Sequence, residues 1–530
     1  MTNTTTGSDL VAPGQQPPAE KRAPLLTRLV RPVAVHWQFA IVVVAAVAVR
    51  LVVVLGYPPI LWFNDSYDYL YDAVTHIPDE VRPNGYPFLI DLFLPLHSAY
   101  PLALLQAAMG VVIGVLIYAL LRHRGLPWWG AALATLPALF DSYELHLEHM
   151  VTADPLFIFL VTVAVVILCW NDRPSVLVMA IAGLLIGYAT LVRSVGEPLL
   201  AVVLVVMLIR RVGWRRLVAL LVAGIVPIGA YMIWFHASYG KYALSESDGT
   251  FLYGRVSTFA ECSNINPPAS LRVLCDPTPP YLRPPAGNYV WSDNELGADR
   301  NKTTPLYNLH HSTDNSLRFT PYTNGLAQKF AERAILAQPV DYLRAVLKDT
   351  LHTFGWNRQP DPLNIAGNGP AFQFVTQKEL NALIPWWVSP APNDAQATEI
   401  YKARKEFAGP GLGNAKAIAP WVRLTQIYQR YIYLRGPFLA VILLIGLAGV
   451  VARWRRWGGV ALLPWLVGAL LIVLPPMTAG FSYRYVLAAA PAVCLAAGLA
   501  FARRPGDKSV GALAADLRRN LGRGPRVEQE

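Results

Sequence analysis

Two carboxylates follow the first long apolar run of the sequence and could act as a general base. Asp65 and Asp68 lie in the segment NDSYDY, three residues apart and so on one face of a helix. A carboxylate in such a place can take the proton of an attacking hydroxyl. We expect Asp65 to be the base, and Asp68 is the alternative base or a ligand of a sugar or a metal. Asp65 could instead only cap a helix, a position that aspartate favours.

Four arginines lie near the ends of apolar runs and could bind a phosphate group. A guanidinium group holds phosphate through paired, charge-assisted hydrogen bonds. Arg82, Arg193 and Arg484 are candidates for this role, and Tyr483 stands directly before Arg484 as a further candidate for substrate binding. Arg50 is the fourth arginine, and we expect it to pair with a carboxylate. The alternative for all four is that they extend to lipid headgroups.

A second group of ionisable residues precedes the apolar run that begins near residue 151. Glu148, His149 and Asp154 are candidates for binding the substrate or a metal ion. The spacing of His146 and His149 could chelate a metal, but the sequence offers no matching third ligand. We therefore assign no metal ligands and no certain cofactor, and a divalent metal remains the open alternative.

A long polar segment contains two of the four cysteines. Cys262 and Cys275 lie there, whereas the other two cysteines lie in apolar runs. If the segment is exported, its compartment permits a disulfide, and we expect these two residues to form one. The alternative is a pair of free thiols. Arg255, in the same segment, could bind an anionic ligand.

The composition indicates a membrane protein. Of the 530 residues, 54% are hydrophobic and only 15% are charged, whereas soluble proteins carry about 25% charged residues. The formal net charge of +11 does not indicate nucleic acid, because the basic residues form short clusters beside apolar runs. We expect membrane lipid as a partner and no nucleic acid.

Ten apolar stretches could each cross a bilayer as a helix, which takes about 20 residues. They lie near residues 37–57, 101–121, 127–143, 151–170, 175–193, 197–209, 217–236, 436–452, 459–475 and 485–502. Basic loops such as 210–216 alternate with loops poor in basic residues, which places the basic loops and both chain termini in the cytoplasm. The predicted fold is an all-α polytopic membrane bundle of about ten spans, with an extracytoplasmic segment of α or α+β structure.

This topology divides the chain into parts. The predicted parts are a disordered cytoplasmic N-terminus (1–36), a transmembrane core (37–236) with a catalytic first outer loop (58–100), an extracytoplasmic domain (237–435), the last spans (436–502) and a cytoplasmic tail (503–530). The ionisable candidates then gather at the outer ends of the spans. A transporter is instead expected to carry polar residues at the midplane of the membrane.

Five segments in this order carry a resemblance to a known family. They are ILWFNDSYDYLYDA, RPNGYPFLIDLF, HLEHMVTADPLFIFL, LVRSVGEPLL and GFSYRYVLAAAP. Together they resemble the motifs of the GT-C superfamily of membrane glycosyltransferases, including protein O-mannosyltransferases and arabinosyltransferases, whose first outer loop carries an acidic catalytic residue. Relatives often show an Asp-Glu pair where this chain has Asp65-Ser66, and their usual Glu before Pro-Leu-Phe is Asp154 here. These departures leave the identity of the base and the metal dependence open.

The resemblance implies an enzyme of the cell envelope. It would move a sugar from a polyprenyl-phosphate donor to a hydroxyl of a glycan, protein or lipid acceptor, at the outer face of the cytoplasmic membrane. A lipid phosphate leaves as a stable anion, so one carboxylate and several cations would suffice, unlike the two carboxylates of glycoside hydrolysis. A single displacement would invert the sugar carbon. The alternatives are an exporter of lipid or polysaccharide and a non-catalytic membrane protein of envelope assembly.

Overall fold

The computed structural model describes residues 36–291, 305–306, 319–357, 373–382, 395–408, 415–453 and 457–502. Within these ranges the chain is built of helices, and its one β contact is an isolated parallel bridge between Leu61 and Met150. The predicted all-α class is confirmed. The predictions for the N-terminus and the tail fall on residues 1–35 and 503–530, outside the described ranges.

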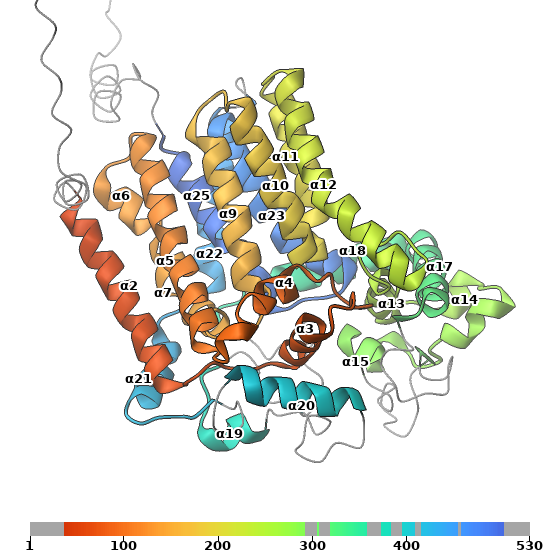
Figure 1. Ribbon diagram of the computed structural model, residues 1–530. Coiled ribbons are helices and arrows are strands. Elements are labelled where there is room, and N and C mark those ends of the chain that lie inside the picture. The colour runs from red at the N-terminus through yellow and green to blue at the C-terminus, as the bar shows by residue number, and fades with distance from the viewer. Residues whose placement is uncertain are drawn as a thin grey trace, which may run out of the picture.

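The apolar stretches form the helices of a bundle (Figure 1). They are α2 (Trp37–Gly56), α5 (Tyr100–His123), α6 (Trp128–Leu133), α7 (Leu136–Phe140), α9 (Asp154–Trp170), α10 (Val176–Val192), α11 (Glu197–Ile209), α12 (Trp214–Tyr239), α22 (Gly436–Ala452), α23 (Leu462–Thr478), α24 (Tyr483–Leu487) and α25 (Ala490–Leu499). Short 3-10 turns lead into two of them, η2 (Ser194–Gly196) before α11 and η8 (Gly459–Ala461) before α23.

Four helical segments are long and apolar enough to cross a membrane. They are α2, α5, α12 and the continuous stretch Gly459–Thr478. A fifth span results if α22 and the preceding α21 (Trp421–Tyr431), which meet at 57°, are counted as one bent span. The other apolar helices of 10 to 17 residues are shorter than a full crossing. The predicted spans therefore coincide with helices, but fewer than the predicted ten reach spanning length in the described part of the chain.

The predicted span at 127–143 is wrong as a single helix. The structure has two short helices there, α6 and α7, and α8 (Ser142–Glu148) follows directly. Pro137 stands in the first turn of α7, where a residue without an N–H group is tolerated but cannot continue the ladder of α6. The Thr135 hydroxyl donates to the Ala132 carbonyl at 2.7 Å and closes the end of α6.

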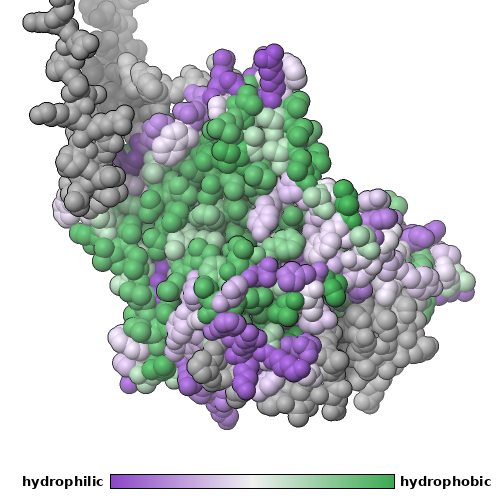
Figure 2. Space-filling view, in the orientation of Figure 1, coloured by the Kyte–Doolittle hydropathy of each residue, from purple (hydrophilic) through white to green (hydrophobic). Residues whose placement is uncertain are grey.

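Close packing of small residues joins α10 to α12. A Cβ atom on Gly183 would lie 2.1 Å from the Leu220 carbonyl oxygen, and one on Gly187 would lie 2.2 Å from the Gly224 carbonyl oxygen. Only glycine fits where two backbones approach so closely, a packing mode common between membrane helices. The surface agrees with a membrane setting, because Figure 2 shows a broad hydrophobic band over the bundle, with hydrophilic surface above it and below it.

The polar segments fold against one end of the bundle (Figure 1). Their elements are α3 (Asn64–Thr75), α4 (Gly85–Asp91), η1 (Leu94–Leu96), α13 (Asp248–Ser257), α14 (Cys262–Ile265), η3 (Ala269–Leu274), η4 (Pro280–Leu282), α15 (Ala286–Trp291), α17 (Pro321–Ala337), α18 (Pro339–His352), α19 (Gln377–Ala382) and α20 (Ala395–Ala408). Among these elements, α20 packs along α3.

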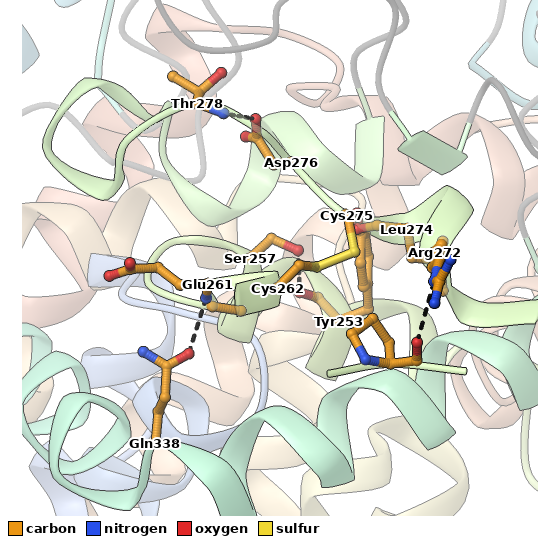
Figure 3. Close-up of a disulfide and its surroundings, with 12 residues drawn as sticks. Tyr253, Ser257, Glu261, Cys262, Arg272, Leu274, Cys275, Asp276, Thr278 and Gln338 are labelled. Atoms are coloured by element: carbon orange, nitrogen blue, oxygen red, sulfur yellow. Dashed lines mark hydrogen bonds between the residues drawn. A yellow bond between two sulfur atoms is a disulfide. The ribbon is translucent and has the colours of Figure 1, made fainter. Parts of the chain in front are cut away.

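The first part of the long polar segment has a small core of its own. Tyr253 on α13 and Phe330 on α17 are buried at its centre, with ring centroids 5.5 Å apart. A disulfide between Cys262 and Cys275 closes a loop with a sequence separation of 13 residues beside this core (Figure 3). The cysteine pair of the sequence-based prediction is therefore joined in the structure, and the alternative of two free thiols is wrong.

Candidate functional site

The start of α3 is fixed to the loop before α9. The Leu61 N–H group donates to the His149 carbonyl at 2.9 Å, and the Val151 N–H group donates back to the Leu61 carbonyl at 3.0 Å. One turn later the Ser66 hydroxyl accepts the Phe63 N–H group at 2.9 Å and donates to the Val151 carbonyl at 2.6 Å. These bonds hold the first turn of α3 beside the start of α9.

Asp65 and Asp154 lie at these two helix starts and are joined by one arginine. Arg484 donates from Nη1 to Asp65 at 2.6 Å and from Nε to Asp154 at 2.5 Å. Arg484 lies in the first turn of α24, more than three hundred residues after both aspartates in the sequence. The alternative that Asp65 caps α3 is wrong, since Phe63 occupies the N-cap and Asp65 lies inside the first turn.

Two further arginines extend this arrangement at both ends. Arg82 donates to Asp65 at 2.9 Å and to Asp68 at 3.1 Å. Arg193 forms an ion pair with Asp154 through Nη1. The result is a continuous chain of alternating charges from Asp68 to Arg193, which we call the arginine–aspartate network. It contains Asp65, Asp68, Arg82, Asp154, Arg193 and Arg484.

The network is closed at its centre and open at its ends. Arg484 and Asp154 have side chains that are 7% and 1% exposed. Exposure rises to 19% for Arg82 and 39% for Asp68. The alternative that Arg82, Arg193 and Arg484 extend to lipid headgroups is therefore wrong, because each guanidinium group is paired with a carboxylate. A polar ligand could approach at the exposed ends.

Aromatic rings support the three guanidinium groups. Arg193 lies over the ring of Tyr485 at 5.0 Å, and Arg484 lies 5.7 Å from the Phe63 ring. Arg82 lies over Trp291, at the end of α15, at 5.8 Å. Cations over aromatic faces gain electrostatic stabilisation. The contact with Trp291 also brings the long polar segment to the edge of the network.

The two carboxylates of α3 differ in their electrostatic surroundings. Burial raises the pKa of Asp65, but the nearby charges of Arg82 and Arg484 outweigh burial and lower that pKa to about 2. The pKa of Asp68 is raised above its usual range by loss of water and by Asp79 and Asp65, with Arg82 opposing. Asp65 is therefore held charged, whereas Asp68 is the more basic of the two in this arrangement.

Arg50 and Glu148 form a separate pair inside the bundle. Arg50 donates to both carboxylate oxygens of Glu148, at 2.6 and 2.7 Å, and to the Leu139 carbonyl at 2.9 Å. Both side chains are almost fully buried. A Cβ atom on Gly110 would lie 1.7 Å from Glu148 Oε1, so glycine makes the space for the pair. Arg50 thus has the carboxylate partner that we expected, and extension to headgroups is wrong for it too.

The remaining candidates do not join the network. His149 is buried, and its Nε2 lies 2.8 Å from the Tyr57 carbonyl oxygen. The Tyr483 hydroxyl donates to the Asn357 carbonyl at 3.1 Å. Arg255 donates to Asp349 at 2.7 Å. In the described part of the chain no three histidine, cysteine or acidic side chains are grouped to hold a metal ion, and no step proposed below uses one.

Two residues near the network were not assigned a role from the sequence. Trp291 and Arg404 come from the long polar segment. Folding brings Trp291 to Arg82, which follows α3, and brings Arg404 to Tyr67 on α3. Both lie in stretches without a recognisable motif. The one sequence signal was the wealth of aromatic residues in that segment, which is equally typical of ordinary packing.

Comparisons with known proteins add little to this geometry. No family model matches the chain, and no curated protein matches it. Among solved structures, the chain is similar to the archaeal oligosaccharyltransferase AglB from Archaeoglobus fulgidus, in a complex with an inhibitory peptide and a dolichol-phosphate. The identity is 12% and the TM-score 0.36, and the match covers 93% of this chain and 52% of that chain. The chain thus spans about half the length of AglB, and a likeness at this score assigns no residue a role.

Proposed function

We propose that the protein is a membrane glycosyltransferase of the GT-C type. It would transfer a sugar from a polyprenyl-phosphate donor to an acceptor hydroxyl at the outer face of the cytoplasmic membrane, with both chain termini in the cytoplasm. The observation that carries the proposal is the arginine–aspartate network. It collects three guanidinium groups and three carboxylates from segments far apart in the sequence, at the end of an apolar bundle.

The three arginines suit a phosphate group that gains charge during the reaction. When the sugar bond breaks, the lipid phosphate takes up the bonding electrons and becomes a more highly charged anion. Fixed cations in a site that excludes water stabilise such developing charge without reorganising. Arg484 is the central cation, since it is the most buried of the three and contacts both Asp65 and Asp154.

Ion-pair exchange would connect donor binding to the base. A phosphate group that paired with Arg82 and Arg484 would remove the two largest of the charges that lower the pKa of Asp65. Burial would remain and would raise that pKa, which makes the freed carboxylate a stronger base. We therefore propose Asp65 as the group that accepts the acceptor proton. Asp68 needs no such exchange and is the second choice.

Direct displacement then follows from this arrangement. The acceptor oxygen attacks the sugar carbon while its proton passes to Asp65, and the bond to the phosphate oxygen breaks on the opposite side. The sugar carbon is inverted in one step. No general acid is needed, because the phosphate leaves as an anion held by Arg484.

Turnover with defined donors tests the assignment. Purified protein in lipid is mixed with radiolabelled polyprenyl-phosphate sugars and envelope acceptors, and consumption of the donor is measured for the wild type, Asp65→Asn and Asp68→Asn. Loss of a general base lowers the rate by about 10²–10⁴-fold, and we expect that loss in Asp65→Asn. Asp172→Asn is the matched control, because Asp172 pairs with Arg124 at a different site and is 61% exposed.

Other outcomes have distinct meanings. Equal turnover by the wild type and Asp65→Asn, with loss in Asp68→Asn, would move the base to Asp68. No consumption of any donor by the wild type would contradict the transferase. Transport of a lipid or polysaccharide without donor consumption would then favour the exporter.

A further inference from the structure

A buried cation lies on the opposite side of α3 from Asp65. Arg404, on α20, is only 2% exposed. Its guanidinium carbon is 5.7 Å from the centre of the Tyr67 ring and 5.6 Å from that of the Tyr401 ring. Tyr67 follows Asp65 by two residues, which on a helix is about 200° around the axis. Arg404 therefore lies outside the arginine–aspartate network.

Among the described residues, Arg404 differs from the other buried arginines because it has no carboxylate partner. Arg50 has Glu148 at 2.6 Å, Arg255 has Asp349 at 2.7 Å and Arg484 has Asp154 at 2.5 Å. Each of these three buried guanidinium groups is thus paired with a carboxylate. In the described part of the chain, Nε and Nη1 of Arg404 have no hydrogen-bond partner at all. Burying a charge without an opposite charge beside it is costly, and buried donors are rarely left unused.

A second unused donor lies against the same tyrosine. The ring of Trp62 stacks on Tyr67 with centroids 5.5 Å apart. Its indole Nε1 is buried and has no hydrogen-bond partner within the described ranges. Tyr67, Trp62 and Ile400 share one small apolar cluster between α3 and α20. Three N–H-bearing atoms, two on Arg404 and one on Trp62, are therefore unused around Tyr67.

We propose that Arg404 binds an oxyanion, a carboxylate or a phosphate group carried by an acidic carbohydrate, and that Trp62 donates to the same ligand. A guanidinium group presents its donors in a planar fork that matches these anions. The half-buried rings of Trp62 and Tyr401 offer apolar faces to the carbohydrate. The site adjoins the helix that carries the candidate base, so the ligand would be the acceptor. That last step rests on the proposed function, whereas the anion site itself does not.

Thermal unfolding tests the anion site without any turnover. The Tm is measured for three full-length proteins in lipid: the wild type, Arg404→Gln and Arg423→Gln. Each is heated with glucuronate, inorganic phosphate or glucose at matched ionic strength. Arg423 is an exposed arginine on α21 and serves as the control. A ligand that binds only the folded protein raises Tm. We expect glucuronate or phosphate, but not glucose, to raise the Tm of the wild type and of Arg423→Gln. None of the three should change the Tm of Arg404→Gln.

The stability of the variant gives an independent readout. Arg404→Gln removes an unpaired buried charge, so without added anion its Tm should equal or exceed that of the wild type. A rise with glucuronate alone would identify a carboxylate sugar, and a rise with phosphate alone a phosphate group. Equal rises in the wild type and Arg404→Gln would overturn the proposal. So would no rise in the wild type, or a lower Tm of Arg404→Gln without anion.

Kinetics separate this proposal from the function. With acidic and neutral acceptor glycans, Arg404→Gln should raise KM for the acidic acceptor and leave kcat and the neutral acceptor unchanged. A loss of kcat with both acceptors would contradict a role in acceptor binding. If the wild type shows the anion-dependent rise in Tm but consumes no donor, the anion site stands and the transferase fails.

Discussion

Two arginines from different parts of the chain keep the Asp65 carboxyl group charged. Arg82 and Arg484 outweigh the effect of burial and lower its pKa to about 2, below the ordinary value of about 3.9. The charged carboxylate therefore adds stability that is complete above about pH 4 and is lost as the pH falls toward 2. We expect Tm of the wild type to decrease across this window and Tm of Asp65→Asn to decrease less. Parallel Tm curves for the two proteins would contradict the pairing.

The buried pair of Arg50 and Glu148 makes a separate prediction. Removal of one partner leaves a buried charge without compensation, which costs about 3–5 kcal/mol. We expect Arg50→Met and Glu148→Met each to lower the free energy of unfolding by about that amount. The double variant should lose less than either single variant, because no lone charge remains. Additive losses in the double variant would show that the two side chains do not stabilise each other.

Single residues of the site could be predicted from their type and their neighbours in the sequence, but their tertiary partners could not. Asp65, Asp154 and Arg484 stand out in the sequence because they are charged residues beside apolar runs. Their mutual partners could not be read from it, since Arg484 meets Asp65 across more than four hundred residues. Arg404 was missed because an arginine on an amphipathic helix is ordinary, and its burial against Tyr67 exists only in the fold.

Helix packing can be tested where α10 meets α12. A Cβ atom on Gly187 would lie 2.2 Å from the Gly224 carbonyl oxygen, so Gly187→Ala must push the helices apart. Such overpacking costs about 1–3 kcal/mol. Gly229→Ala, on α12, is the matched control, since its Cβ meets nothing within 4 Å and alanine favours the helix by about 1 kcal/mol. A similar loss in both variants, measured by thermal unfolding, would show that helix contact is not the cause.

Helices were the most predictable level of the structure. Stretches such as 37–57 and 217–236 have the length and apolar character that a bilayer requires, and α2 and α12 lie there. The stretch 127–143 is apolar over most of its length but breaks into α6 and α7, because Pro137 has no N–H group with which to continue the backbone hydrogen bonds of α6. The start of α22 was predictable as well, since the apolar stretch 436–452 begins where that helix begins, whereas the 57° angle to α21 was not.

The orientation of the whole molecule can be tested by labelling. The two free cysteines, Cys169 and Cys494, are buried, so a new cysteine on the surface reports its own position. Lys402 on α20 and Arg215 at the start of α12 are exposed at opposite ends of the bundle (Figure 1). In intact cells we expect a membrane-impermeant maleimide to label Lys402→Cys and to spare Arg215→Cys. Labelling of Arg215→Cys alone would invert the proposed topology.

The long polar segment 237–435 stands out in the sequence by its composition, but its contacts could not be predicted. Its two cysteines indicated the disulfide. Its contacts with Arg82 through Trp291 and with α3 through Arg404 depend on long-range packing, which local patterns do not encode. In the described part of the molecule, residues of the two polar segments 58–100 and 237–435 therefore meet around α3.

The most direct test of the central claim follows the release of polyprenyl phosphate from a radiolabelled donor by the wild type, Arg484→Gln and Arg124→Gln. Arg124 pairs with Asp172 away from the network and is the control. If Arg484 stabilises the departing phosphate, its loss should lower the rate by about 10²–10³-fold, as loss of one fixed donor does in other sites, while Arg124→Gln keeps the wild-type rate. Equal release by all three proteins would contradict the account.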